Sequence, residues 1–190
     1  MQEEDGYLVE KFKDEIEYEG SIHIDKLSEK NPNYKDQVRI VLNDEYMSNK
    51  LRSYGMVDHK SLVLEFPQFL DEKYLRHFIR GYFDGDGGVF YDSKRNKLST
   101  NTTGTLDVVT NIKRILNLMG IECHIYHPKK SINSNTYVLY TSGNKSSLKY
   151  LSWMYENSYI KMIRKNDKYL YAKIKHGTNE NLIMSNELYE

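Results

Sequence analysis

The chain has 190 residues, of which 39% are hydrophobic and 28% are charged. These values are typical of a globular protein and argue against a disordered one, and the length allows one domain or two closely packed halves. No apolar run reaches the roughly 18 residues that a membrane helix requires. The single cysteine, Cys123, excludes a disulfide framework and a cysteine-rich zinc site. We therefore expect a cytoplasmic, reducing environment.

The charge is unevenly distributed along the chain, although the net charge is zero. Residues 1–70 contain 9 basic and 15 acidic side chains, a net charge of −6, and their acidic start, MQEEDGYLVE, lacks the apolar core of a signal peptide. Residues 71–175 contain 18 basic and 9 acidic side chains, a net charge of +9, and the last 15 residues carry −3. The basic part is compatible with a polyanionic partner and equally with an ordinary solvated surface.

Two parts of the chain resemble each other when the sequence is shifted by 100 residues. The aligned pairs are YLVEKFKDEI (7–16) with DVVTNIKRIL (107–116), Gly20 with Gly120, and VRIVL (38–42) with VLYTS (138–142). The first pair shares the apolar stripe of a helix, and each glycine follows its helix where a left-handed residue is expected. The third pair has the composition of strands, and each strand precedes a turn into another helix. Each copy therefore predicts the order helix, strand, strand, helix.

The second copy has additional predicted elements on both sides. A helix over residues 72–85 precedes it, followed by a hairpin that turns near Lys94–Asn96. A basic amphipathic helix over about Lys161–Lys175 follows it. The chain then divides into an incomplete first repeat (1–70), a complete second repeat with a four-stranded sheet (71–176) and an acidic tail (177–190).

The helix over residues 72–85 ends in an unusual sequence, FDGDGG, after an expected N-cap at Asp71. Its glycines Gly81 and Gly85 lie on one side, a spacing that lets another helix approach closely. Carboxylates at a helix C-terminus are electrostatically unfavourable, and a divalent cation of the magnesium type would compensate for them. Two acids beside a scissile phosphate would support metal-assisted phosphodiester hydrolysis.

Two other interpretations of FDGDGG follow from known loop chemistry. A calcium-binding EF-hand loop starting at Asp84 would need glycine at its sixth position and glutamate at its twelfth, where this chain has Val89 and Arg95. The EF-hand interpretation therefore fails. A helix stop followed by a glycine-rich turn into the hairpin remains an alternative to a metal site.

The nine residues IRGYFDGDG (79–87) resemble the LAGLIDADG motif, the signature of a family of homing endonucleases and intein-embedded nucleases. Gly81, Asp84, Asp86 and Gly87 match the motif identically, and the resemblance extends from about residue 5 to 175. It implies an α+β fold of two pseudo-symmetric αββαββα repeats. The motif helices would pack at the centre, and the saddle-shaped antiparallel sheets would lie over double-stranded DNA.

The resemblance also implies roles for individual residues. Asp86 would be catalytic and bind Mg²⁺ or another divalent cation, and Asp84 would support the end of the helix. Lys165, in the late segment MIRK (162–165), would stabilise the phosphate or tune the attacking water, unless it is one solvated lysine on a basic helix. Gly81 and Gly85 would pack the motif helices.

Polar and basic side chains that alternate along the predicted hairpin are candidates for DNA binding, because a period of two places them on one face of a sheet. These candidates are Tyr91, Ser93, Lys94, Arg95, Lys97, Ser99, Asn101 and Thr103, with Lys129 and Lys130 extending the surface. The same pattern is also typical of ordinary exposed strands.

The chain departs from the family pattern in its first repeat. The counterpart of Asp86 would lie at 86 − 100 = −14, before Met1. We therefore expect one of the two acids and an uncovered apolar face on the helix over residues 74–83. A truncated sequence, a homodimer through Gly81 and Gly85 or a nuclease that has lost cleavage would each account for this. The functions left open are a DNA endonuclease, a non-cleaving DNA-binding or regulatory module, and a structural domain.

Overall fold

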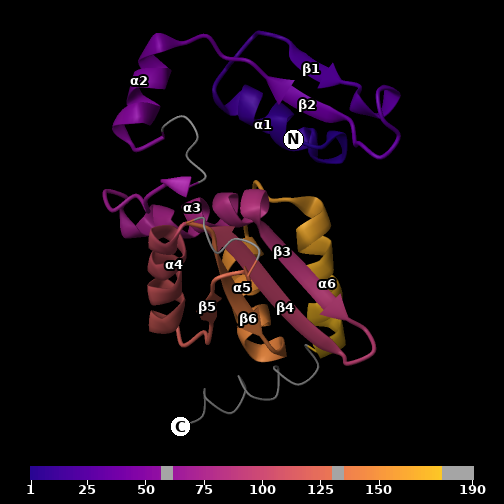
Figure 1. Ribbon diagram of the computed structural model, residues 1–190, viewed down its shortest axis with the longest axis vertical. Coiled ribbons are helices and arrows are strands. Elements are labelled where there is room, and N and C mark those ends of the chain that lie inside the picture. Colours follow the sequence, from indigo (N-terminus) through magenta and orange to yellow (C-terminus); the bar gives the residue numbers. More distant parts are fainter. Residues whose placement is uncertain (57–61, 130–134, 177–190) are drawn as a thin grey trace.

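The computed structural model describes residues 1–56, 62–129 and 135–176 and shows an α+β protein of two units (Figure 1). The first unit contains α1 (Tyr7–Glu15), β1 (Ile22–Asp25), β2 (Gln37–Ile40) and α2 (Glu45–Ser53), with short 3₁₀ helices η1 (Glu3–Asp5) and η2 (Leu27–Glu29). The second contains α3 (Glu72–Asp86), β3 (Gly87–Asp92), β4 (Lys97–Gly104), α4 (Leu106–Leu118), β5 (His124–Tyr126), β6 (Tyr137–Ser142), α5 (Asn144–Tyr155) and α6 (Ile163–His176). Within the described ranges, no helix is long and apolar enough to cross a membrane.

The element order confirms the predicted fold class. The second unit follows the order αββαββα from α3 to α5, and the first unit has the αββα order of its second part. Both sheets are antiparallel: β1 pairs with β2, and the second unit has the order β3-β4-β6-β5. Figure 1 shows the first unit at one end of the molecule, beside the end of the second unit where α3 lies.

The local signals for helix ends are correct in some places and wrong in others. Gly120 has a φ of +66° after α4, as predicted, but Gly20 is not left-handed; Glu17 is, with a φ of 51°. The reason is that α1 ends early, where Tyr18 N–H donates to the Lys13 carbonyl and closes the last turn. Asp71 stands at the N-cap of α3, but its side chain makes no capping hydrogen bond.

The hydrophobic core lies in the second unit. It joins α3, the inner face of the four-stranded sheet and helices α4, α5 and α6, with Ile79, Phe83 and Ile112 fully buried. Within residues 1–56, the buried apolar side chains are Val9 and Val38. Two strands and two helices cannot enclose a core of useful size, so the second unit dominates the packing.

The expectation that the apolar face of α3 is uncovered is wrong for one of its two rows. Ile79 and Phe83 point into the core of their own unit, and Phe78 packs edge-on against Phe66. Tyr82 is partly buried and donates to the Thr103 carbonyl at 3.1 Å. The same repeat therefore buries the row of Ile79 and Phe83, whereas Phe78 and Tyr82 are partly buried and also line an open groove along α3.

The edge of β2 that does not face β1 is occupied by the start of the chain. Met1 and Val38 exchange backbone hydrogen bonds at 3.0 and 2.8 Å, and Gln2 forms a bridge with Gln37. The counterpart of β2 in the second unit is β6, and there β4 occupies the edge that the chain start occupies on β2.

Candidate functional site

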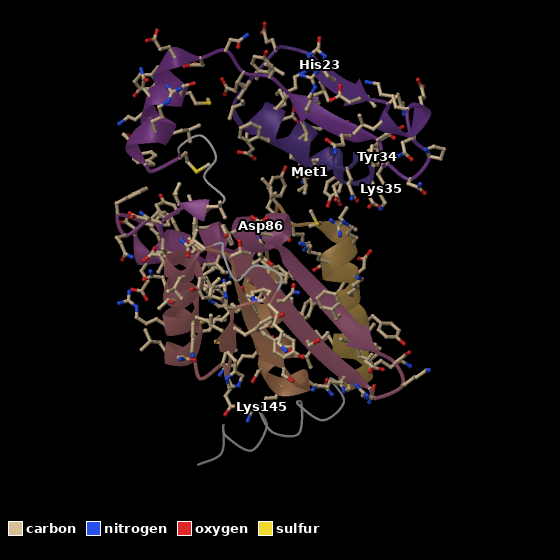
Figure 2. The ribbon with its side chains drawn as sticks, in the orientation of Figure 1. Met1, His23, Tyr34, Lys35, Asp86 and Lys145 are labelled. Carbon is tan, nitrogen blue, oxygen red and sulfur yellow. The ribbon has the colours of Figure 1, made fainter. Side chains whose placement is uncertain are left out.

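The candidate site is built around the end of α3. Asp86 is the last residue of the helix, and its side chain is exposed to solvent. Figure 2 shows it at the edge of the second unit that faces the first. The chain enters β3 directly, because Gly87 is already extended. A Cβ atom on Gly87 would clash with the Phe83 ring, and one on Gly88 would clash with Asn101 and Phe90. Gly87 is therefore required by the abrupt change from helix to strand, because a Cβ atom there would also lie 2.6 Å from the Phe83 carbonyl oxygen, whereas one on Gly88 would meet only the ends of side chains.

Asp84 has an environment opposite to that of Asp86. It is 8% exposed, and its two carboxylate oxygens accept hydrogen bonds from the Tyr155 hydroxyl at 2.6 Å and the Met162 backbone N–H at 2.9 Å. Burial raises the pKa of this carboxyl, although the hydrogen bonds and the nearby Lys165 act in the opposite direction. Asp84 thus joins the last turn of α3 to α5 and to the segment before α6, and it is not available to a ligand in solvent.

Lys165 is buried against the end of the same helix. It is 5% exposed, and its ammonium group donates to the carbonyl oxygens of Phe83 and Asp84 at 2.7 and 2.8 Å. These carbonyls belong to the last turn of α3, where the helix carries partial negative charge. Burial lowers the pKa of Lys165 to about 8, with Asp84 opposing the change. A lysine of this chain therefore provides the positive charge that FDGDGG had suggested a metal ion should provide.

A mainly apolar groove of about 790 Å³ lies along the glycine side of α3. Gly81 and Gly85 are exposed, and a Cβ atom at either position would meet no atom within 4 Å. The groove is also lined by Leu51, Tyr54 and Met56 near the end of α2, by Pro67, Phe69 and Leu70 before α3, and by Asp86. The one side of α3 that its own unit leaves open is the side that carries both glycines and ends at Asp86.

The predicted alternation along β4 is present. Lys97, Ser99, Asn101 and Thr103 are exposed or partly exposed, whereas the intervening residues are buried. Since α4, α5 and α6 all contact the sheet, this buried side faces the helices, and the alternating polar residues lie on the open side. Sequence reasoning missed Phe90, which is 52% exposed and lies opposite Ser99 on the same open side. The pairing register of β3 with β4 places Phe90 opposite Ser99, and this register cannot be read from the sequence alone.

Tyr91 was wrongly assigned to this open side. It pairs with the buried Leu98, and its ring packs against Tyr171 and His176 of α6 at centroid distances of 5.2 and 5.9 Å. The physical reason is parity, because Tyr91 is adjacent to Phe90 and must point to the opposite face.

The remaining candidates lie at the ends of strands. Ser93, Lys94 and Arg95 form the exposed hairpin turn, where the Asp92 carboxylate accepts the N–H groups of Lys94 and Arg95 at 3.0 and 3.1 Å. Lys129 is exposed after β5. Lys130 lies outside the described residues.

The described residues do not form a complete metal site by themselves. No group of three or more His, Cys, Asp or Glu side chains that could hold a metal ion occurs within them. Asp86 supplies one carboxylate, and Asp84 uses both of its oxygens inside the protein. Magnesium is usually bound by one or two carboxylates together with substrate phosphates, so a two-acid centre would need a second acid from outside this set.

Comparison with known proteins finds a family model that matches most of the second unit. Residues 73–153 match the family model of the LAGLIDADG-like domain. Over 78 residues, 41% of this chain, the sequence is 30% identical to the DNA-directed RNA polymerase subunit Rpo1C of Methanocaldococcus jannaschii, of which the match spans 9%. The chain therefore spans less than a tenth of the length of this curated relative.

Two crystal structures of the homing endonuclease I-CvuI also resemble the fold. One holds its target in the presence of Ca, and the other holds the I-CreI target, not cleaved, in the presence of Mg. Both are 11% identical in sequence to this chain. The match to the first covers 58% of this chain and 73% of the endonuclease chain, with a TM-score of 0.38. The match to the second covers 60% and 75%, with a TM-score of 0.39.

The family match extends from the first turn of α3 into α5 and includes the whole four-stranded sheet. It contains the motif residues Gly81, Asp84 and Asp86 in one helix, with the hairpin directly after them. The greater part of the second unit, residues 73–153, is thus similar to the LAGLIDADG-like domain.

Proposed function

We propose that this chain is a DNA-binding, homing-endonuclease-like domain that contributes Asp86 to metal-dependent hydrolysis of phosphodiester bonds in double-stranded DNA. The observation that supports this most directly is the position of Asp86, which is exposed at the end of the motif helix and borders the groove over Gly81 and Gly85. A carboxylate in this place is accessible both to a metal ion and to a second helix.

A second acid would come from another copy of the chain. In a symmetric pair, α3 of each copy would lie in the groove of the other, with Gly81 and Gly85 at the crossing. The two copies of Asp86 would then meet and hold the divalent cation between them. When bound, Mg²⁺ would stabilise the charge that develops on the scissile phosphate.

The open side of the four-stranded sheet would bind the DNA. Its polar side chains occur at a spacing of two residues on β4, and the basic hairpin turn continues them. Basic groups would contact phosphates and determine affinity, whereas Ser99 and Asn101 have the donors and acceptors that contact base edges. The net charge of +9 over residues 71–175 favours such a polyanion.

A non-cleaving DNA-binding or regulatory module is the second candidate function. It is favoured by the single accessible acid and by the engagement of Lys165 with the carbonyls of α3, which leaves that lysine without direct access to a phosphate. We also propose a cytoplasmic location, on the basis of the single, buried Cys123. Association with an intron or an intein stays a prediction.

The experiment that separates the two functions is a magnesium-dependent nicking assay on supercoiled plasmid, run beside a DNA-binding measurement at several salt concentrations. The proposed nuclease predicts nicking by the wild type that is lost in Asp86→Asn. Nicking that is unaffected by this substitution would refute the proposed centre. Salt-dependent binding without nicking would support the regulatory module, and absence of both would exclude a nucleic-acid role.

A further inference from the structure

The first unit is attached to the second through the start of α1. The Tyr7 hydroxyl donates to the Lys161 carbonyl at 3.1 Å and accepts the Ile163 backbone N–H at 2.6 Å. Asp5, which is 2% exposed, accepts Arg164 Nε at 3.0 and 3.2 Å with its two oxygens. We refer to residues 161–165 as the clamp segment. Both contacts from the first unit therefore end on the clamp segment, at the start of α6.

The same segment also holds the end of the motif helix. The Met162 N–H donates to Asp84, and Lys165 donates to the last carbonyls of α3. Within the clamp segment, Lys161, Ile163 and Arg164 contact the first unit, whereas Met162 and Lys165 contact α3. Any movement of this backbone would change both sets of contacts together.

An equivalent contact, related by the 100-residue shift, is found at the start of α4. The Thr105 hydroxyl donates to the Leu64 carbonyl at 2.6 Å, and Asp107 accepts the Phe66 N–H at 2.7 Å. Thr105 and Asp107 are the counterparts of Asp5 and Tyr7. The start of α1 therefore binds the segment after α5, and the start of α4 binds the segment after α2. Different side chains make these contacts, but they stand at the same two positions of the repeat. A recurrence of this kind indicates a built connection between the units.

We propose that Asp5 and Tyr7 are positioning residues for Asp86, which act from the first unit through the clamp segment. Loss of the Tyr7 hydroxyl would leave the Lys161 carbonyl and the Ile163 N–H without their partner. The start of α6 would then open more often, and the Met162 N–H bond to Asp84 would open with it. Asp86, two residues beyond Asp84, would lose its defined position. The catalytic significance of this coupling rests on the proposed function, whereas the coupling itself does not.

The test is amide hydrogen exchange on the full chain carrying Tyr7→Phe, which keeps the ring and removes both hydrogen bonds. We expect exchange to be about tenfold faster at residues 162–166 and at residues 84–88. Tyr18→Phe is the matched control, because its hydroxyl donates to the Val41 carbonyl within the first unit; it should leave both segments unchanged. Asp5→Asn provides a second variant and should give the same pattern.

The proposal is overturned if Tyr7→Phe and Asp5→Asn speed exchange near residues 5–12 and 162–166 while residues 84–88 exchange as in the wild type. It is also overturned if Tyr18→Phe has the same effect as Tyr7→Phe. In the nicking assay, Tyr7→Phe should lower kcat several-fold with KM little changed. A wild type that does not nick would refute the proposed nuclease, and the exchange result would still decide the coupling.

Discussion

At the scale of single residues, the two aspartates of the motif have different roles because they are two positions apart on one helix. Side chains at i and i+2 point about 200° apart, so Asp84 points into the protein when Asp86 points out of it. Asp84 is held by Tyr155 and Met162, while Asp86 is free to meet solvent or a ligand. The motif therefore combines a structural acid and an accessible acid.

This difference predicts opposite effects of the same substitution. Asp84→Ala leaves the Tyr155 hydroxyl, the Met162 N–H and the buried Lys165 without their carboxylate, and it should lower the free energy of unfolding by about 2–4 kcal/mol. Asp86→Ala removes an exposed charge at a helix C-terminus and should change the free energy of unfolding by less than about 0.5 kcal/mol. Urea unfolding of both variants measures the difference. Equal destabilisation would contradict the assignment of the two environments.

Lys165 makes a prediction about pH. Burial lowers its pKa to about 8 in the folded protein from the ordinary lysine value of 10.5, so between these values the unfolded chain binds more protons than the folded one. Stability from this group therefore rises as pH increases through this window. Relative to Lys165→Met, the free energy of unfolding of the wild type should gain about 2 kcal/mol between pH 8 and 10. The buried tyrosines titrate in both proteins and cancel in the difference; a constant difference would contradict the buried state of Lys165.

At the scale of elements, α3 is a helix with one unsatisfied side. One of its apolar rows is buried in its own unit, and the open side contains Phe78, Tyr82 and two glycines that the unit does not need for packing. Glycine in a helix interior costs about 1 kcal/mol relative to alanine. The proposed pairing through α3 would account for two such residues beside a groove.

Substitutions at Gly81 test this explanation. Gly81→Ala should raise the free energy of unfolding of the monomer by about 1 kcal/mol, because the added methyl group meets open space. Gly81→Leu should fill the groove and abolish self-association, as measured by sedimentation velocity over a range of concentrations. If the wild type remains a monomer at every concentration, or if Gly81→Leu associates as the wild type does, pairing through α3 is wrong.

The four-stranded sheet is the second element with a testable surface. Lys97→Glu, on the open side, should weaken DNA binding about tenfold at 0.1 M salt and reduce the salt dependence by about one ion. Lys149→Glu makes the same change of charge on α5, a helix that contacts the sheet, and should change the affinity by less than about twofold. Fluorescence anisotropy with a labelled duplex measures both. Equal losses would show that only net charge matters and that the open side is not the binding surface.

At the scale of the whole molecule, the two units differ in how well they are packed. The second unit contains the continuous core, whereas Val9 and Val38 are the buried apolar side chains of residues 1–56. The first unit depends on polar contacts, among them Asp5 with Arg164 and Tyr7 with the clamp segment. Regions with few buried apolar contacts open at low free-energy cost.

Amide hydrogen exchange should therefore separate the units. Amides of β1 and β2 should exchange at least tenfold faster than those of β4 and β6, because the latter pair lies over the core. Thermal unfolding should deviate from a single two-state transition for the same reason. Similar protection in both sheets would contradict an independent, weakly packed first unit.

The sequence by itself determined the features that depend on neighbours along the chain. The helix end at Asp86, the hairpin turn near Lys94–Asn96, the alternation along β4 and the 100-residue repeat all follow from side-chain period and turn chemistry, which act over a few residues. The family resemblance added the proposed role of Asp86, which is to bind a divalent cation and take part in catalysis.

Only the tertiary structure decided the features that depend on distant segments. Lys165 is buried because α6 begins against the end of α3, and the Tyr91 ring is covered because α6 lies on that face of the sheet. The row of Ile79 and Phe83 on α3 is buried because α5 and the sheet lie against it. The contacts of Lys165 and of the Tyr91 ring join residues 80 or more positions apart, and a local pattern contains no information on which of its faces a distant segment will cover.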